Sequence, residues 1–146
     1  MLIIKIVTIL FLVLEAANVV TLYFFPGTTL ANGVGVFRAW EKAQRDPEIQ
    51  RFVRYLVNWV AGTKLIFLLL LIVIIFTAGE ATLPWVALAM ALAIASFFWR
   101  LFPLARQMDQ AGELAPRGYS KTLGGLIAVF VLVFLIAGLL VLLQYP

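Results

Sequence analysis

Four long apolar runs, separated by more polar connections, constrain this chain more than any other feature of its sequence. The runs lie at residues 2–25, 53–78, 83–102 and 123–145. About 20 helical residues span the roughly 30 Å hydrocarbon layer of a bilayer, and each run is long enough to do so. The sequence therefore predicts an all-α integral membrane protein whose chain crosses the bilayer four times.

The composition of the chain agrees with a lipid surrounding. Apolar residues make up 64% of the 146 residues and charged residues 12%, whereas soluble domains contain about 45–50% and about 25%. The chain contains neither Cys nor His, which excludes disulfides, thiol chemistry, zinc sites with those ligands and acid–base catalysis by His. No catalytic or cofactor motif stands out, so we expect no cofactor and no metal.

The basic residues are distributed very unevenly along the chain. Nine of the eleven lie in the connections at 26–54 and 100–121, and the turn at 77–83 has none. Cytoplasmic loops of membrane proteins carry an excess of Lys and Arg. We therefore expect both basic connections on the cytoplasmic side of the plasma membrane and both termini outside. Lys5 is the one basic residue that runs against this orientation.

Trp and Tyr residues provide a second, independent signal, because both prefer the headgroup level of a bilayer. Seven of the eight lie at or near an end of an apolar run, and the eighth, Trp40, lies in the first connection. The predicted inner boundary is marked by Tyr23, Tyr55, Trp59, Trp99 and Tyr119, and the outer boundary by Trp85 and Tyr145.

The first connection contains further structure after a glycine-rich stretch that we expect to be flexible. Residues 36–45 have the pattern of a short amphipathic helix on the inner membrane surface. Asp46-Pro47-Glu48 then combines an N-cap, a proline at the first helical position and an acidic residue in the first turn. The basic residues expected to contact lipid headgroups are Arg38, Lys42, Arg45, Arg51 and Arg54.

These signals together predict a four-helix bundle made of two hairpins, as one transmembrane domain with a short interfacial helix. The helices are expected at about 2–25, 47–78, 83–102 and 122–145, from the rule of about 20 residues per crossing. Small residues at every fourth position let helices approach closely, within the bundle or between copies of the chain, and we favour the bundle. The small residues concerned are Ala87, Ala91, Ala95, Gly124 and Ala128.

Glu15 is the most informative polar residue within the runs. It lies near mid-membrane, where insertion of a comparable charge costs about 2.5–3.5 kcal/mol. Asn18 and Thr8 share its helix face by their spacing. One interpretation is a protonatable or cation-binding site in a transport path. The other, which we favour, is a polar clasp between helices, where each contact contributes about 0.6 kcal/mol.

Lys64 is the second charge within a run, and it reaches nearly the same depth as Glu15. Its flexible stem could carry the ammonium group to the nearby headgroups, past Trp59. Alternatively, Lys64 could pair with Glu15 on the neighbouring antiparallel helix. The direction in which helical side chains lean favours the first arrangement.

The sequence thus favours a non-catalytic multi-pass membrane protein, as an accessory or scaffold subunit of a membrane assembly or as a self-associating bundle. The first alternative is a small oligomeric transporter or ion pathway that uses Glu15. The second is a membrane enzyme that acts on a lipophilic substrate through Arg51, Arg54 and Tyr55. Expected partners are bilayer lipids and other copies or membrane subunits. Nucleic acid is not expected, because no stacking platform accompanies the basic loops.

Overall fold

A computed structural model describes residues 1–144, and the predicted boundary marker Tyr145 lies outside them. The structure contains α1 (Leu2–Phe24), the 3-10 turn η1 (Val34–Val36), α2 (Arg38–Ala43), α3 (Pro47–Thr77), α4 (Leu83–Ala95), α5 (Phe97–Gln110) and α6 (Tyr119–Gln144). No β-strand occurs among the described residues, so the all-helical class is confirmed.

Four helical segments are long and apolar enough to cross a membrane: α1, α3, α4 continued by α5, and α6. Their most apolar windows have mean hydropathies from 1.8 to 3.4. Such windows are typical of transmembrane helices. The protein is therefore a multi-pass membrane protein.

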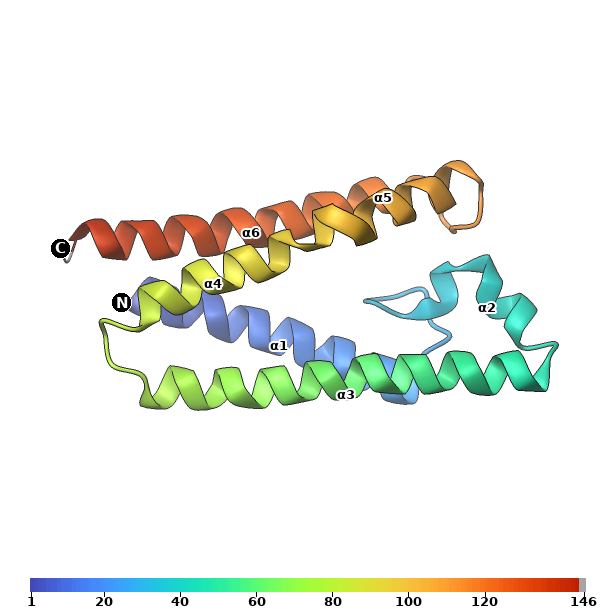
Figure 1. The fold of residues 1–146 in the computed structure, drawn as a ribbon, viewed down its shortest axis with the longest axis horizontal. Helices are drawn as coiled ribbons and strands as arrows, with labels where there is room; N and C mark the ends of the chain where they lie inside the picture. The colour runs from blue at the N-terminus through green and yellow to red at the C-terminus, as the bar shows by residue number, and fades with distance from the viewer. Residues whose placement is uncertain (145–146) are drawn as a thin grey trace.

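The four segments lie roughly parallel to one long axis and place the connections at two opposite ends (Figure 1). The start of α1, the end of α6 and residues 78–82 lie at one end, which we call the opposite end. Residues 25–46 and 111–118 lie at the other end, which we call the basic end. Four of the eleven basic residues lie in these connections, and five more lie on the roughly three helix turns next to them.

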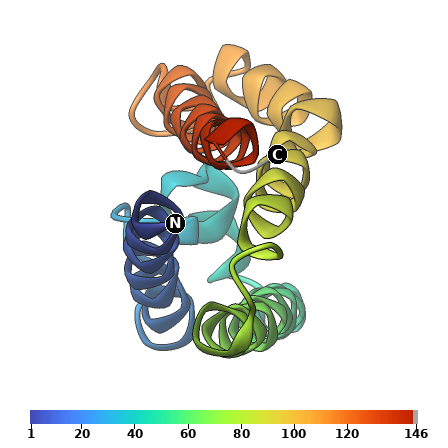
Figure 2. The same cartoon turned by 90° about the vertical axis from the view of Figure 1, so that its left-hand side faces the viewer.

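The helices pack mainly as two pairs. Helix α1 packs along α3, while α4 packs along α6, and α5 continues along the first turns of α6. Weaker contacts of α1 with α6 and with α4 connect the pairs. The view along the long axis shows the four segments around a common centre (Figure 2).

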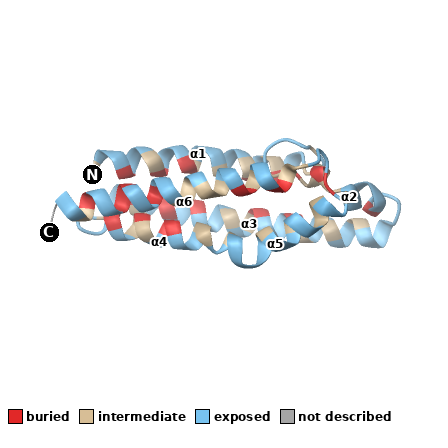
Figure 3. Cartoon of the chain, turned by 90° about the horizontal axis from the view of Figure 1, so that it is seen from above, coloured by how far each residue is buried: buried red, intermediate tan, exposed pale blue. Residues whose placement is uncertain are grey.

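The buried residues are concentrated in the half of the molecule near the opposite end (Figure 3). Their main cluster draws on α1, α3, α4 and α6, with Phe134 fully enclosed and Ile4 and Leu83 nearly so. In the basic half, Leu22 packs with two α3 residues, and α5 buries no residue. The two helix pairs therefore meet closely in one half only.

The start of α3 follows from its sequence as predicted. The Asp46 side chain accepts hydrogen bonds from the backbone N–H groups of Glu48 and Ile49 at 2.9 and 3.2 Å. Pro47 occupies the first turn, where its missing N–H costs nothing. The 31 residues of α3 exceed the length needed to cross a bilayer, so its first turns project beyond the apolar layer.

The predicted third helix ends too early at residue 102. The chain stays helical through Pro103 to Gln110, with one interruption at Ser96. The Ser96 hydroxyl donates to the Ala93 carbonyl at 2.6 Å, a contact that bends helices. Pro103 removes only one backbone hydrogen bond, and the amphipathic residues after it continue the helix. Helix α6 likewise begins three residues before the predicted start.

The predicted interfacial helix at 36–45 is also shorter in the structure, because Phe37 adopts an extended backbone between η1 and α2. Phe37 forms an isolated β-bridge with Leu114 of the second basic loop. Arg38 N–H donates to the Glu113 carbonyl at 2.9 Å, and Ala115 N–H donates to the Val36 carbonyl at 2.8 Å. This bridge, which we did not predict, ties the two basic loops together.

Candidate functional site

Glu15 of α1 and Lys64 of α3 form an ion pair that links the two helices. The Glu15 side chain is 18% exposed and the Lys64 side chain 28%. Asn18 donates its side-chain N–H to the other carboxylate oxygen of Glu15 at 3.1 Å. Of the two arrangements considered for Lys64, the structure contains pairing with Glu15 and not extension toward the headgroups. It is the one ion pair within residues 1–144.

Each charge of this pair compensates the other in a medium that solvates neither. Insertion scales assign about 2.5–3.5 kcal/mol to a single Lys, Arg or Asp at the centre of a transmembrane helix. Both carboxylate oxygens of Glu15 have a partner, one on its own helix and one on α3. The pair therefore links α1 to α3 in addition to their apolar packing.

Thr8 does not belong to this polar cluster. Its side chain is buried, and its hydroxyl donates to the Ile4 carbonyl of the preceding turn at 2.7 Å. The hydroxyl is thus satisfied within α1. The shared helix face suggested by the sequence does not bring Thr8 to Glu15.

The ion pair borders a pocket of about 430 Å³ in the basic half of the molecule. The pocket lies between the pair α1–α3 and the pair α5–α6, where the helix pairs separate. Its lining is mainly aliphatic and aromatic: Leu22, Leu56, Val57, Val60, Phe97, Leu101, Leu123 and Ile127. Only Glu15, Lys64, Asn32 and Tyr119 add polar side chains.

A layer of aromatic rings separates the ion pair from the opposite end. The ring of Phe11 packs edge-on against Phe67 at 6.5 Å and against Phe130 and Phe134 at 5.5 Å between centroids. Phe11 is one helical turn from Glu15 along α1, and Phe67 is one turn from Lys64 along α3. The pocket therefore ends at the ion pair, and packed rings fill the level beyond it.

The glycine-rich part of the first loop lines the pocket on the basic side, through Asn32, Gly33 and Val34. The sequence predicted flexibility here, but the segment is folded: Val34 N–H donates to the Pro26 carbonyl at 2.7 Å, and Gly35 N–H to the Thr28 carbonyl at 3.1 Å. This loop and Tyr119 are site residues that sequence reasoning missed. The available signal was three glycines within nine residues.

Two of these glycines are required by close backbone contacts. A Cβ atom at Gly33 would lie 2.2 Å from the Thr28 carbonyl oxygen, and one at Gly35 would lie 2.1 Å from the Gly27 carbonyl oxygen. Both distances are far below any van der Waals contact. Only residues without a side chain let the loop fold over the pocket in this way.

The five basic residues expected to contact headgroups lie apart from the pocket. Arg38, Lys42 and Arg45 are exposed on the first loop, and Arg51 and Arg54 are exposed on the first turns of α3. Tyr55, which the enzyme hypothesis included, is 64% exposed and stacks on Trp59. None of these residues lines the pocket beside the ion pair.

The small residues singled out in the sequence lie at contacts within the chain. Ala87 and Ala91 are buried in the core shared with α6, whereas Ala95 and Ala128 are half-buried. Gly124 packs on the Phe102 ring of α5, so close that a Cβ there would lie 2.5 Å from the ring.

The chemistry available at the site is limited to charge pairing, hydrogen bonding and apolar contact. Within residues 1–144, no group of three or more Asp and Glu residues is placed to hold a metal ion. No protein-family model, curated protein or solved structure matches the chain.

Proposed function

We propose that this chain is a non-catalytic subunit of an assembly in the cytoplasmic membrane, formed with other membrane proteins or with further copies of itself. In this proposal its four membrane segments form a bundle of two hairpins. The ion pair is the observation that carries the proposal, because the two charges inside the apolar layer are used to hold α1 against α3.

The outer surface of the helices supports an assembly role. Only 17–22% of the residues in each apolar window are buried within the chain. Phe76 is 81% exposed and Leu92 76%. Helices in lipid associate through van der Waals packing and interhelical hydrogen bonds, and such surfaces serve lipid and neighbouring helices equally well.

Extraction of the native membrane into polymer-bounded discs, followed by mass measurement, tests the assembly. We expect particles that contain more than one copy of the chain, or one copy with a second membrane protein at fixed ratio. Re-extraction at several expression levels is the control against crowding, since a specific complex keeps its stoichiometry. A monomer without a partner at every level contradicts the proposal.

The proposed orientation places the basic end in the cytoplasm, on the evidence of the nine basic residues there. Because the chain has no cysteine, single cysteines introduced at the exposed Ala81 and Ala111 form a matched pair. We expect a membrane-impermeant maleimide to label Ala81→Cys on intact cells and Ala111→Cys only after permeabilisation. The reverse pattern contradicts the orientation.

A second candidate function is a small ion pathway, and the pocket favours it. Glu15 and Lys64 line a space in the basic half, while packed rings fill the next level toward the opposite end. That asymmetry resembles one state of a path with access from one side at a time. In this proposal Glu15 exchanges its partner Lys64 for a proton or a cation.

Reconstitution into liposomes that contain a pH-sensitive dye tests this second candidate. We expect wild-type protein to raise proton flux above that of empty liposomes, and Glu15→Gln to return the flux to the empty level. Glu80→Gln, in the exposed turn at the opposite end, is the matched control and should retain the flux. Equal, pH-independent flux in all samples excludes the ion pathway.

A further inference from the structure

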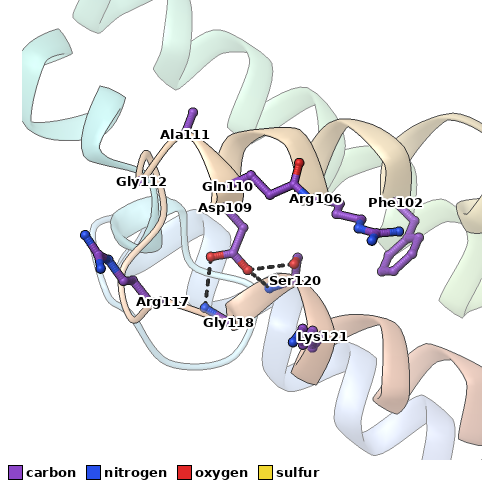
Figure 4. Close-up of a pocket in the computed structure, with 10 residues that line it drawn as sticks. All are labelled: Phe102, Arg106, Asp109, Gln110, Ala111, Gly112, Arg117, Gly118, Ser120 and Lys121. Carbon is purple, nitrogen blue, oxygen red and sulfur yellow. Dashed lines mark hydrogen bonds between the residues drawn. The ribbon is translucent and has the colours of Figure 1, made fainter.

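A second pocket, of about 740 Å³, lies at the basic end between the end of α5 and the start of α6 (Figure 4). Three basic side chains line it: Arg106, Arg117 and Lys121. All three are exposed, and none of them pairs with a carboxylate in the described structure. The pocket therefore carries uncompensated positive charge.

The one carboxylate in this pocket, Asp109, is already committed to α6. It accepts hydrogen bonds from Gly118 N–H at 2.9 Å, from Ser120 N–H at 3.0 Å and from the Ser120 hydroxyl at 2.6 Å. These bonds, with the charge of Lys121, hold the pKa of Asp109 below its ordinary value of 3.8. Asp109 thus caps the N-terminus of α6. The three basic side chains and this one carboxylate together give the pocket a net charge of about +2.

The position of the pocket relative to the bilayer indicates what kind of ligand reaches it. Phe102 lines its membrane side and contacts Gly124, and Arg106 and Lys121 lie about one helical turn beyond that contact. Trp99, one turn before Phe102, is 76% exposed and lies below the Arg100 guanidinium. Exposed Trp residues lie at the membrane–water interface, and the third apolar run ends at Phe102. Arg106 and Lys121 therefore lie just beyond the apolar layer, on the side where lipid headgroups are found.

We propose that this pocket binds the phosphate-bearing headgroup of an anionic phospholipid. Arg106, Arg117 and Lys121 surround the phosphate, Phe102 contacts the start of the acyl chains, and Asp109 keeps the loop in place. Arg pairs with phosphate through two parallel hydrogen bonds, which gives such a pocket a preference beyond simple charge attraction. The lipid would join α5 to α6 at the end where the protein core is thinnest.

Native mass spectrometry of the full-length protein tests this site, with phosphatidylglycerol or phosphatidylcholine added in detergent at about 0.15 M salt, where exposed charges are screened beyond about 8 Å. We expect retained phosphatidylglycerol and no retained phosphatidylcholine. Arg106→Gln and Lys121→Gln should each weaken retention about fivefold, and the triple variant with Arg117→Gln more strongly.

The matched control removes three exposed basic residues of the first loop, with Arg38→Gln, Lys42→Gln and Arg45→Gln together. It changes the net charge equally, so we expect less than about a twofold loss, because those charges are diffuse and screened. Equal loss of phosphatidylglycerol in both triple variants, or full retention in both, overturns the proposed lipid site. Unchanged helical circular dichroism and thermal midpoint in each variant ensure that binding, and not folding, is measured.

Glycerol phosphate distinguishes a lipid from a soluble phosphate compound. At millimolar concentration we expect it neither to displace phosphatidylglycerol nor to raise the thermal midpoint, because it lacks the acyl chains that contact Phe102. Displacement or stabilisation by glycerol phosphate alone would overturn the lipid assignment and indicate a soluble phosphate ligand.

Discussion

The two halves of this molecule are packed in different ways. Toward the opposite end, buried residues of α1, α3, α4 and α6 form one continuous core around Phe134. Toward the basic end, α1 still packs on α3 and α5 on α6, but a pocket of about 430 Å³ lies between the pairs. There the pairs are connected by the bridge between Phe37 and Leu114.

This difference shows that direct helix packing and loop contacts can hold the same four helices at their two ends. Moving an apolar side chain from lipid into a helix contact gives little hydrophobic free energy, because lipid is equally apolar. Close packing of helices in a membrane therefore depends on how well their surfaces fit. Near the opposite end, Ala87 and Ala91 of α4 and Ala137 and Gly138 of α6 are buried, and they let these two helices approach closely. Near the basic end, large side chains such as Phe97 line the space between the pairs, and the glycine-rich loop closes it.

The largest expected effect comes from truncating one aromatic side chain in each half. Phe134→Ala should lower the free energy of unfolding by about 3 kcal/mol, because the cavity would be enclosed on all sides. Phe97→Ala, which only enlarges an existing pocket, should cost about 1 kcal/mol. Unfolding in mixed detergent and SDS measures both. Equal losses would mean that the halves are packed alike.

A second test concerns the loop that closes the basic half. Gly35→Ala places a Cβ against the Gly27 carbonyl and should cost about 2 kcal/mol, in the range of overpacking strain. Gly79→Ala is the matched loop control, since no atom lies within 4 Å of its Cβ. Protease resistance of residues 26–37 and thermal midpoints provide the readout. A Gly35→Ala protein as stable as Gly79→Ala would show that this loop fold is dispensable.

The ion pair at the boundary between the halves provides a third test. Glu15→Leu and Lys64→Leu should each destabilise the protein, because each leaves the other charge without its partner. The double variant should recover much of that loss. We expect a coupling free energy of about 1–2 kcal/mol, near the upper end for polar contacts in membranes. Strictly additive losses would mean that the two charges do not interact.

The smallest expected effect is a dependence on acid at the basic end. The pKa of Asp109 is lowered by its hydrogen bonds with Ser120 and Gly118. Its stabilising contribution is therefore present above the unfolded pKa, near 3.8, and is lost as pH falls through the lower folded value. Thermal midpoints of wild type and Asp109→Asn should differ at pH 6 and converge below pH 3.8. A constant difference across this range would contradict the assignment.

Local features of the sequence predicted the helical class and the four segments able to cross a membrane. Run length determines which segments can cross a bilayer, and Asp46-Pro47 determines where α3 begins, because a cap acts through the adjacent backbone. The end of the third segment was predicted wrongly, because the apolar run stops at residue 102, just before Pro103, whereas the helix continues to Gln110 along α6.

Only part of the candidate site could be predicted from the sequence. Glu15 and Lys64 stood out, because isolated charges in apolar runs are rare and costly. Their pairing could not be derived from the sequence, because it depends on how α1 and α3 are rotated about their axes. A helix that is apolar on all sides has no polar face that would indicate this rotation. The loop over the pocket was missed for a similar reason: glycine permits many conformations and specifies none.

The sequence by itself determined that this chain is a helical membrane protein with charge gathered at one end, because helix length and residue hydration are properties of short segments. Only the tertiary structure decided that Glu15 meets Lys64, that Phe37 meets Leu114 and that the helix pairs separate around a pocket. Those contacts join residues far apart in the chain, and their energies depend on shape and distance, which no local pattern records.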